Sequence, residues 1–385
     1  MARGAPNRMA VITTGHRWGD PRIFERSVAS CLAWGLEVHV FAPLERLPEP
    51  QGWSRDPRLA LHPLVPPAGR VGRLALAWTA LKAVLAAGPF ALAHFHDPEL
   101  VPAMAVLGLL RPGCYTLYDI HEDLPLQMES KGYLPGWIRF PMARLADWML
   151  HLASGCFTGF APATEAISRS WPSAQTRIVH NYPKAVFSQA GVPDVPVDPD
   201  RVLYVGGLAA GRGILVVLEA LALARGTRPR LGLELVGEIM EPEVERAIRA
   251  AEAQGWCRHI PWLFPEQLAA HAAGCGVGLV TLLPQPNYLE SLPTKLFEYM
   301  AMGIPVLASD FPLWRRLVAD SGAGRVVRPE PEAVAAALLA MVQDRDGLRR
   351  HAEAGRAAYR DRYRWEAEAG NLRWHLVRAG LTPSR

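Results

Sequence analysis

Two carboxylates, Glu290 and Glu298, stand at either end of a short polar loop in residues 288–312. A helical pattern begins at the end of this loop and stops at Gly303, and an apolar strand pattern follows. Because the first N–H groups of a helix lack partners and carry the positive end of its dipole, an anion or a sugar hydroxyl is the expected ligand there. The loop residues that would meet it are Ser291, Leu292, Pro293 and Thr294. The alternative is that both glutamates are solvated residues at a helix start, where acids are favoured.

A second polar segment follows the apolar run 201–205, where Gly206 and Gly207 lead into Gly211-Arg212-Gly213 before a helical pattern. Glycines allow the backbone to approach a ligand closely, and Arg212 adds a fixed positive charge near a helix start, which suits a pyrophosphate. The spacing is neither G-x-G-x-x-G nor a Walker loop, so a simple tight turn is the alternative.

Histidines follow several predicted strands in the N-terminal half, namely His16, the pair His94 and His96 before Asp97, and His121. Because the carboxyl ends of parallel strands meet at one edge of a sheet, we expect these side chains to converge. A metal site built from His94, His96, Asp97 and His121 is an alternative, but the spacing fits no standard zinc motif and we expect no metal.

The elements that would position these residues alternate between strand and helix patterns, which predicts parallel sheets with right-handed crossovers. In the first series we expect strands at 9–13, 37–42, 92–96, 116–120, 156–160 and 177–179, and helices at 23–34, 73–87, 101–109 and 137–153. In the second we expect strands at 201–205, 232–236, 258–260, 277–281 and 304–308, and helices at 214–224, 244–254, 265–273, 332–343, 346–360 and 365–376.

These two series predict two Rossmann-like α/β domains that face each other across a cleft. The predicted N-terminal domain spans 1–183 and is joined by the C-terminal helix 363–385; the second domain spans 201–362. Residues 184–200 between them are rich in Pro and Asp, which is typical of a linker, and Asp198-Pro199-Asp200 is interpreted as part of it.

Composition excludes several classes of protein. A chain of 385 residues with a net charge of +4 fits two globular domains and argues against a nucleic-acid-binding protein. Five cysteines without a C-x-x-C pair favour neither zinc nor disulfides and fit a reducing cytoplasm. The first residues lack the apolar core of a signal peptide.

The stretch 133–152 mixes Trp and Arg with aliphatic residues. Such a helix can lie on a membrane surface, which predicts peripheral contact at the inner membrane face. The alternative is a half-buried helix with snorkelling arginines.

The run Glu290-Ser-Leu-Pro-Thr-Lys-Leu-Phe-Glu298, with Gly303-Ile-Pro-Val-Leu-Ala-Ser-Asp after it, resembles the Glu-x7-Glu region of retaining family-4 glycosyltransferases with the GT-B fold, also described as glycosyl transferases group 1. The stretches Gly15-His16-Arg-Trp-Gly-Asp20, His94-Phe-His96-Asp97 and Asp119-Ile-His121-Glu-Asp are similar as well. The resemblance implies a sugar transfer from a UDP-, GDP- or dTDP-linked donor, without a cofactor, to a hydroxyl of a sugar, a lipid-linked molecule or a small molecule.

The resemblance also implies roles for single residues in donor binding. Glu298 would bind the donor ribose, and Glu290 would hold the donor sugar in the reaction together with the amides of residues 291–294. Arg212 stands where the family usually has a phosphate-binding lysine. Gly207 stands where the family often has an arginine, and Lys295 would supply the missing charge.

In the first domain, the resemblance places His121 near the reacting sugar carbon, and Gly15 in a turn that lets the donor phosphate or the acceptor approach. His16, Asp20, His96 and Asp97 are the expected acceptor-binding residues. Retention would proceed by front-face attack, in which the departing phosphate oxygen takes the acceptor proton, so that no protein nucleophile is needed. The alternatives are a GT-B epimerase or phosphorylase, and a non-catalytic protein that binds sugar nucleotides.

Overall fold

The computed structural model describes residues 7–16, 18–43, 52–65, 70–121, 124–125, 136–189 and 197–384. The chain divides into two compact units, which we call unit 1 (Met1–Asn181 with Glu368–Arg385) and unit 2 (Tyr182–Ala367). Glu122, Asp123 and the first part of the stretch 133–152 lie outside the described residues.

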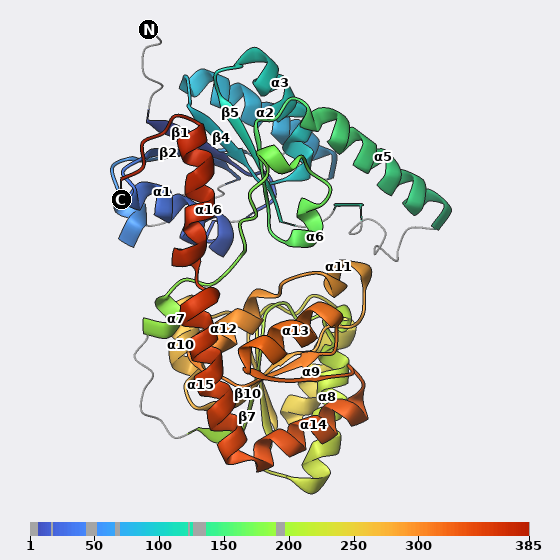
Figure 1. Ribbon diagram of the computed structural model, residues 1–385. Coiled ribbons are helices and arrows are strands. Elements are labelled where there is room, and N and C mark those ends of the chain that lie inside the picture. The colour runs from blue at the N-terminus through green and yellow to red at the C-terminus, as the bar shows by residue number, and fades with distance from the viewer. Residues whose placement is uncertain are drawn as a thin grey trace. The chain divides into compact units, whose positions relative to one another are not determined.

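Unit 1 is built on a parallel six-stranded sheet in the order β3-β2-β1-β4-β5-β6 (Figure 1). Its strands are β1 (Arg8–Ile12), β2 (Glu37–Ala42), β3 (Leu59–Pro63), β4 (Leu92–Phe95), β5 (Tyr115–Ile120) and β6 (Gly159–Pro162). Its helices are η1 (Pro21–Val28), α1 (Ala29–Ala33), η2 (Gly52–Arg55), α2 (Arg70–Ala87), η3 (Pro98–Leu100), α3 (Val101–Leu110), α5 (Gly136–Ser154), α6 (Glu165–Ser168), η4 (Ser173–Gln175) and most of α16 (Trp365–Arg378).

The two faces of this sheet differ because neighbouring strand residues point to opposite sides. Phe95, Tyr118 and Ile120 pack into the apolar core under α2, α3 and α5. Their neighbours His94 and Asp119 therefore point to the other face, where they are buried without lying in that core. A buried carboxylate on an otherwise apolar strand needs a cation or a set of donors nearby.

Unit 2 has a second parallel six-stranded sheet, in the order β12-β11-β10-β7-β8-β9. Its strands are β7 (Asp198–Val205), β8 (Gly232–Val236), β9 (Cys257–Ile260), β10 (Cys275–Val280), β11 (Val306–Ser309) and β12 (Gly324–Val327). Its helices are α7 (Val186–Gln189), η5 (Ala210–Arg212), α8 (Ile214–Thr227), α9 (Pro242–Ala253), α10 (Pro265–Ala272), α11 (Pro286–Leu289), α12 (Thr294–Met302), α13 (Pro312–Ser321), α14 (Pro331–Gln343) and α15 (Arg345–Arg362).

Helices cover both faces of the unit 2 sheet (Figure 1). One apolar cluster joins the sheet to α10, α12, α13 and the end of α15, and a second joins it to α8, α9 and α14. The prediction of two Rossmann-like α/β domains is confirmed.

Several predicted elements are wrong in detail. Residues 177–179 form no strand: the backbone N–H groups of Arg177 and Val179 donate to β6, but only Thr176 makes a ladder bridge. The helix predicted at 23–34 begins two residues earlier as a π-helix, η1, because Asp20 caps its start. The edge strands β3 and β12 and helix α13 were not predicted. The predicted linker 184–200 contains α7, and Asp198-Pro199-Asp200 belongs to β7.

In the part of the chain that the structure describes, no helix is both long and apolar enough to cross a membrane.

Candidate functional site

The loop before α12 has the geometry expected of a binding loop. Pro293 occupies the N-cap position of α12, and its side chain makes no cap hydrogen bond to the first N–H groups of the helix. The loop itself is fixed, because Ser291 donates its hydroxyl to the Tyr288 carbonyl at 3.0 Å and Trp314 donates its indole N–H to the Ser291 carbonyl at 2.8 Å. Glu290 is exposed in this loop, and Glu298 is half-buried further along α12.

Tyr299 holds α12 against the middle of the sheet. Its hydroxyl accepts the Val205 N–H at 2.9 Å, where β7 ends. Its ring lies over Gly278 of β10, where a Cβ would come within 2.6 Å of the ring, so only glycine fits. This packing brings the start of α12 next to the loop that follows β7.

Lys295 is the most unusual residue of this site. It is 8% exposed, and its Nζ is buried with no hydrogen-bond partner in the described structure. The amine lies 3.6 Å from the centre of the Tyr204 ring. Burial lowers the pKa of Lys295 well below its usual value, and the nearby Arg212 charge lowers this pKa further, while Glu298 raises it.

The glycine pair after β7 completes this arrangement. A Cβ on Gly206 would lie 3.4 Å from the Lys295 Nζ, and a Cβ on Gly207 would lie 3.1 Å from an Arg212 guanidinium nitrogen. Lys295 and Arg212 therefore both approach the backbone of Gly206 and Gly207, which carries no side chains. A phosphate can come close to such a backbone and lie next to both cationic groups.

The turn into α8 depends on Gly213. Its φ is +78°, and a Cβ there would lie 1.8 Å from the Thr281 carbonyl oxygen. Leu283 donates its N–H to the Gly211 carbonyl at 3.1 Å. The loop that carries Arg212 is thus fixed to the end of β10.

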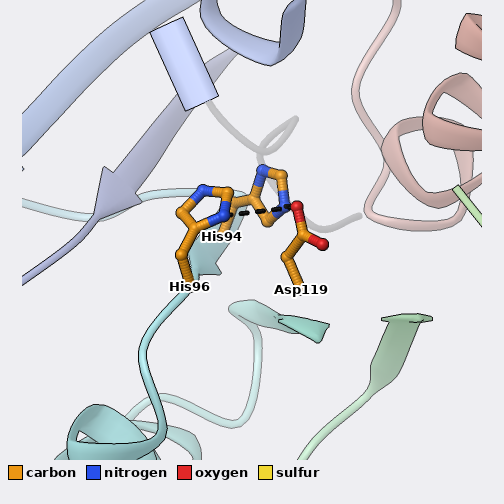
Figure 2. A group of neighbouring side chains, drawn as sticks. All are labelled: His94, His96 and Asp119. Carbon is orange, nitrogen blue, oxygen red and sulfur yellow. Dashed lines mark ion pairs between the residues drawn. The ribbon is translucent and has the colours of Figure 1, made fainter. Parts of the chain in front are cut away.

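Unit 1 contains a buried group of charged and imidazole side chains, part of which Figure 2 shows. Arg22 donates from Nε and Nη2 to Oδ1 of Asp119 at 3.1 and 2.5 Å. His94 Nε2 and His96 Nδ1 lie 3.3 and 3.2 Å from Asp119 Oδ2. Burial raises the pKa of Asp119, but the Arg22 guanidinium and the neighbouring imidazoles of His121 and His94 together hold that pKa well below the ordinary value.

His121 joins this group from the outside. Its Nε2 lies 3.1 Å from His96 Nδ1, and its side chain is 19% exposed. The rings of His121 and His16 are 5.0 Å apart. His16, His96 and His121 therefore converge as the sequence predicted.

Asp97 organises the turn after β1. Its Oδ2 accepts the Thr13 hydroxyl at 2.6 Å and the N–H groups of Thr14 and Gly15 at 2.6 and 3.2 Å. Its Oδ1 lies 3.0 Å from His16 Nδ1. Asp97 thus binds Gly15 and His16, and both of its oxygens are engaged within the protein.

Asp20, an expected acceptor-binding residue, fixes the start of η1. Its Oδ1 accepts the N–H groups of Arg22 and Ile23 at 2.9 and 3.0 Å, so this side chain caps η1. It thereby positions Arg22, whose charge reaches Asp119.

His94, His96 and Asp119 are close enough to share a metal ion, with one ligand atom of each within 4.8 Å of the others. Arg22 already supplies the positive charge that Asp119 needs, at bonding distance. A divalent cation would be added beside a buried guanidinium, which is electrostatically costly. The residues therefore fit a metal poorly.

The sequence interpretation missed Arg22 and Asp119 as site residues. They are 97 positions apart, and no local pattern joins them. The available signal was a carboxylate, Asp119, inside an apolar strand pattern, because such a residue must find a cation.

Comparison with known proteins agrees with this geometry. Residues 199–344 match the family described as Glycosyl transferases group 1. The chain is 26% identical over 357 residues to the phosphatidyl-myo-inositol mannosyltransferase of Mycolicibacterium smegmatis, covering 88% of this chain and 84% of that protein. The chain is a glycosyltransferase, and its residues 199–344 are of the group 1 type.

The glycosyltransferase also resembles solved structures. It superimposes on sucrose-phosphate synthase from Thermosynechococcus elongatus with a TM-score of 0.75 at 21% identity, covering 97% of this chain and 99% of that one. An Anabaena protein in complex with UDP and glucose gives a TM-score of 0.67 at 15% identity, covering 96% and 99%. These likenesses support the GT-B fold, and the prediction of a glycosyltransferase is confirmed.

Proposed function

We propose that this glycosyltransferase transfers a sugar, with retention of configuration and without a metal ion, from a nucleotide-diphosphate sugar bound to unit 2. The observation that carries the proposal is the pair of cationic side chains, Lys295 and Arg212, at the bare backbone of Gly206 and Gly207. A departing diphosphate needs such charge, and fixed cations in a largely dry site supply it efficiently.

The remaining donor contacts follow from α12. The donor sugar lies at the start of α12, where the N–H groups of Leu292 and Thr294 donate to its oxygens and the carboxylate of Glu290 accepts from its hydroxyls. Glu298 accepts hydrogen bonds from the ribose diol. The neighbour solved with UDP and glucose is consistent with this class of donor. UDP-, GDP- and dTDP-sugars share the chemistry that these residues recognise.

In unit 1, His121 is a catalytic residue, and His16 and His96 take part in acceptor binding. No protein nucleophile is required, because the departing phosphate oxygen takes the proton of the acceptor hydroxyl. Asp97 and Asp20 contribute by holding the turn after β1 and the start of η1.

The acceptor is lipid-linked, and the enzyme meets it at the cytoplasmic face of a membrane. The support is α5, which exposes a broad apolar face while Ala143 and Leu150 are buried on its other side. The exposed residues are Trp137, Phe140, Met142, Leu145, Trp148, Met149 and Leu152. Such a helix lies in the interface of a bilayer, with Trp at the headgroups and Arg144 toward phosphates. Five free cysteines suit a reducing compartment.

A thermal-shift screen of UDP-, GDP- and dTDP-sugars tests the donor site. We expect one nucleotide to stabilise the wild type, Arg212→Ala and Glu298→Ala to lose most of that shift, and Arg212→Lys to keep part of it because it preserves the charge. Wild-type shifts in both alanine variants would refute the site, and no shift with any nucleotide would refute the proposal.

Co-sedimentation with vesicles of phosphatidylglycerol and phosphatidylethanolamine tests the lipid surface. We expect the wild type to sediment and a Trp137→Ser, Trp148→Ser, Leu152→Ser variant to stay in the supernatant. Leu223→Ser, at an exposed leucine of α8, is the matched control and should sediment like the wild type. Equal sedimentation of all three proteins would refute a role for α5.

A further inference from the structure

The buried group in unit 1 constrains where the protons of its histidines lie. Asp119 is 1% exposed and paired with Arg22, so it is ionised and can only accept hydrogen bonds. His96 is 3% exposed and directs Nδ1 at two atoms, Asp119 Oδ2 at 3.2 Å and His121 Nε2 at 3.1 Å. The opposite nitrogen, Nε2, is buried and has no hydrogen-bond partner in the described structure.

His96 must therefore carry its proton on Nδ1. A bare Nδ1 would turn its lone pair toward an ionised carboxylate in a buried site, which is repulsive. Burial, together with the neighbouring His94, lowers the pKa of His96 well below its usual value, so the ring is neutral and holds a single proton. That proton is shared between Asp119 Oδ2 and His121 Nε2.

The proton on His96 fixes the state of His121 in turn. His121 Nε2 lies 3.1 Å from His96 Nδ1 but 3.7 Å from Asp119 Oδ2, so of these two only the His96 nitrogen is within hydrogen-bonding distance. Because His121 Nε2 faces the His96 N–H, it acts as an acceptor, and a proton placed on it would point at the His96 proton. With Nε2 as the acceptor, the His121 ring holds its own proton on Nδ1. No described residue accepts a hydrogen bond from this nitrogen.

We propose that Asp119 is a positioning residue that acts through His96 to hold His121 in the Nδ1–H tautomer, so that His121 offers a hydrogen-bond donor, and not a base, to an oxygen of the bound substrate. The contact with substrate rests on the proposed function; the tautomer does not. Figure 2 shows the first link, with His94 and His96 directed at the carboxylate of Asp119. The charged groups around the chain of contacts are Arg22, Asp119, Asp97 and His16.

This arrangement suits a transfer in which the leaving phosphate takes the acceptor proton. A neutral donor at His121 stabilises negative charge on an oxygen in the transition state without competing for that proton. Removal of one such donor typically lowers the rate by about 100-fold. Asp119 itself touches no substrate in this account.

Long-range 1H–15N correlation spectra of the full chain labelled with 15N-histidine test the tautomer directly. The signals of His121 are identified by their loss in His121→Gln. We expect a protonated nitrogen at Nδ1 and an unprotonated one at Nε2. A protonated Nε2 in the wild type would overturn the proposal.

Two substitutions of His96 separate positioning from folding. His96→Leu removes the shared donor, so we expect His121 to lose its single tautomer; His96→Asn keeps an N–H near the position of Nδ1 and should restore it. An unchanged His121 spectrum in His96→Leu would overturn the proposal. Asp119→Asn should likewise cost His121 its single tautomer. The signals of the remaining histidines in the same spectrum show whether this variant is folded.

Kinetics of donor turnover complete the test. Asparagine places its N–H near Nδ1 of histidine and glutamine near Nε2, so His121→Asn should retain most of the rate and His121→Gln should lose about 100-fold. Equal losses in both variants would contradict the donor role of Nδ1. Failure of every nucleotide to bind would refute the proposed function but would leave the predicted tautomer standing.

Discussion

Replacing Lys295 by methionine should make the folded protein more stable and its binding of the donor weaker. The Nζ is buried with no hydrogen-bond partner in the described structure, and leaving such a group unpaired costs about 1–3 kcal/mol. Methionine keeps the length of the side chain and removes the polar atom. Loss of the contact with Tyr204, about 0.5–2 kcal/mol, offsets part of the gain.

The expected net stabilisation is about 1 kcal/mol, or about 2–4 °C in Tm for a domain of this size. The stabilisation of Lys295→Met relative to the wild type should be smaller at high pH. Because the pKa of Lys295 is lowered in the folded state, the unfolded chain binds more protons between that pKa and 10.5, and wild-type stability rises with pH across this window.

Donor binding should change in the opposite direction. The bound diphosphate would give Lys295 the hydrogen-bond partner that its Nζ lacks among the described residues, and a hydrogen bond to a charged group is worth about 1.5–3 kcal/mol. Its loss weakens binding by about 10- to 150-fold. Isothermal titration with the best nucleotide sugar measures the Kd, and differential scanning calorimetry measures the Tm.

The matched control is Lys82→Met, at an exposed lysine of α2, which should change neither quantity. A Lys295→Met variant that binds the donor like the wild type would refute the role of this amine. A variant with lower Tm would show that Lys295 is satisfied in the folded state.

Three further perturbations follow from the structure. His180 lies between Glu165 and Glu368 at 3.2 and 3.1 Å; burial lowers its pKa, but the two carboxylates outweigh this and raise it to about 9. His180→Gln should therefore cost at most about 3 kcal/mol below pH 6.5 in denaturant titrations, and the difference should vanish as the pH rises through 9; a constant difference would contradict the pairing. Gly213→Ala, whose Cβ would meet the Thr281 carbonyl, should lose more than about 2 kcal/mol in the same assay, whereas Gly226→Ala in α8, with open space at its Cβ, should gain about 0.5–1 kcal/mol. Elemental analysis should find no stoichiometric zinc or manganese, and EDTA should leave donor turnover unchanged, because Arg22 already compensates Asp119; one tightly held equivalent of metal would contradict this.

Much of the fold was predictable because the spacing of apolar residues and the positions of the glycines and prolines that end elements agree along the chain. The stretch from the loop before α12 to β11 shows this: helical spacing ends at Gly303, whose φ of +69° suits glycine, and an apolar strand follows. The edge strands were harder, since β3 and β12 are only partly buried and lack a strong apolar pattern.

The candidate site was predictable as a set of polar residues at strand ends, but its pairings were not. Asp119 and Arg22 meet only through the packing of η1 on the sheet. Asp20 has the residue type of a ligand and serves as a helix cap, which no spacing distinguishes. The lack of a hydrogen-bond partner for Lys295 in the part of the chain that the structure describes is likewise a property of the packed interior around Tyr204 and α12.

The stereochemistry of donor hydrolysis tests the central claim most directly, because water can replace the acceptor. The enzyme is incubated with the α-linked nucleotide sugar that binds best, and the first sugar released is followed by 1H NMR before it mutarotates. We expect the α anomer to appear first, and we expect Arg212→Ala to release it far more slowly than the wild type. First appearance of the β anomer, or of a sugar epimerised at another carbon, would contradict it.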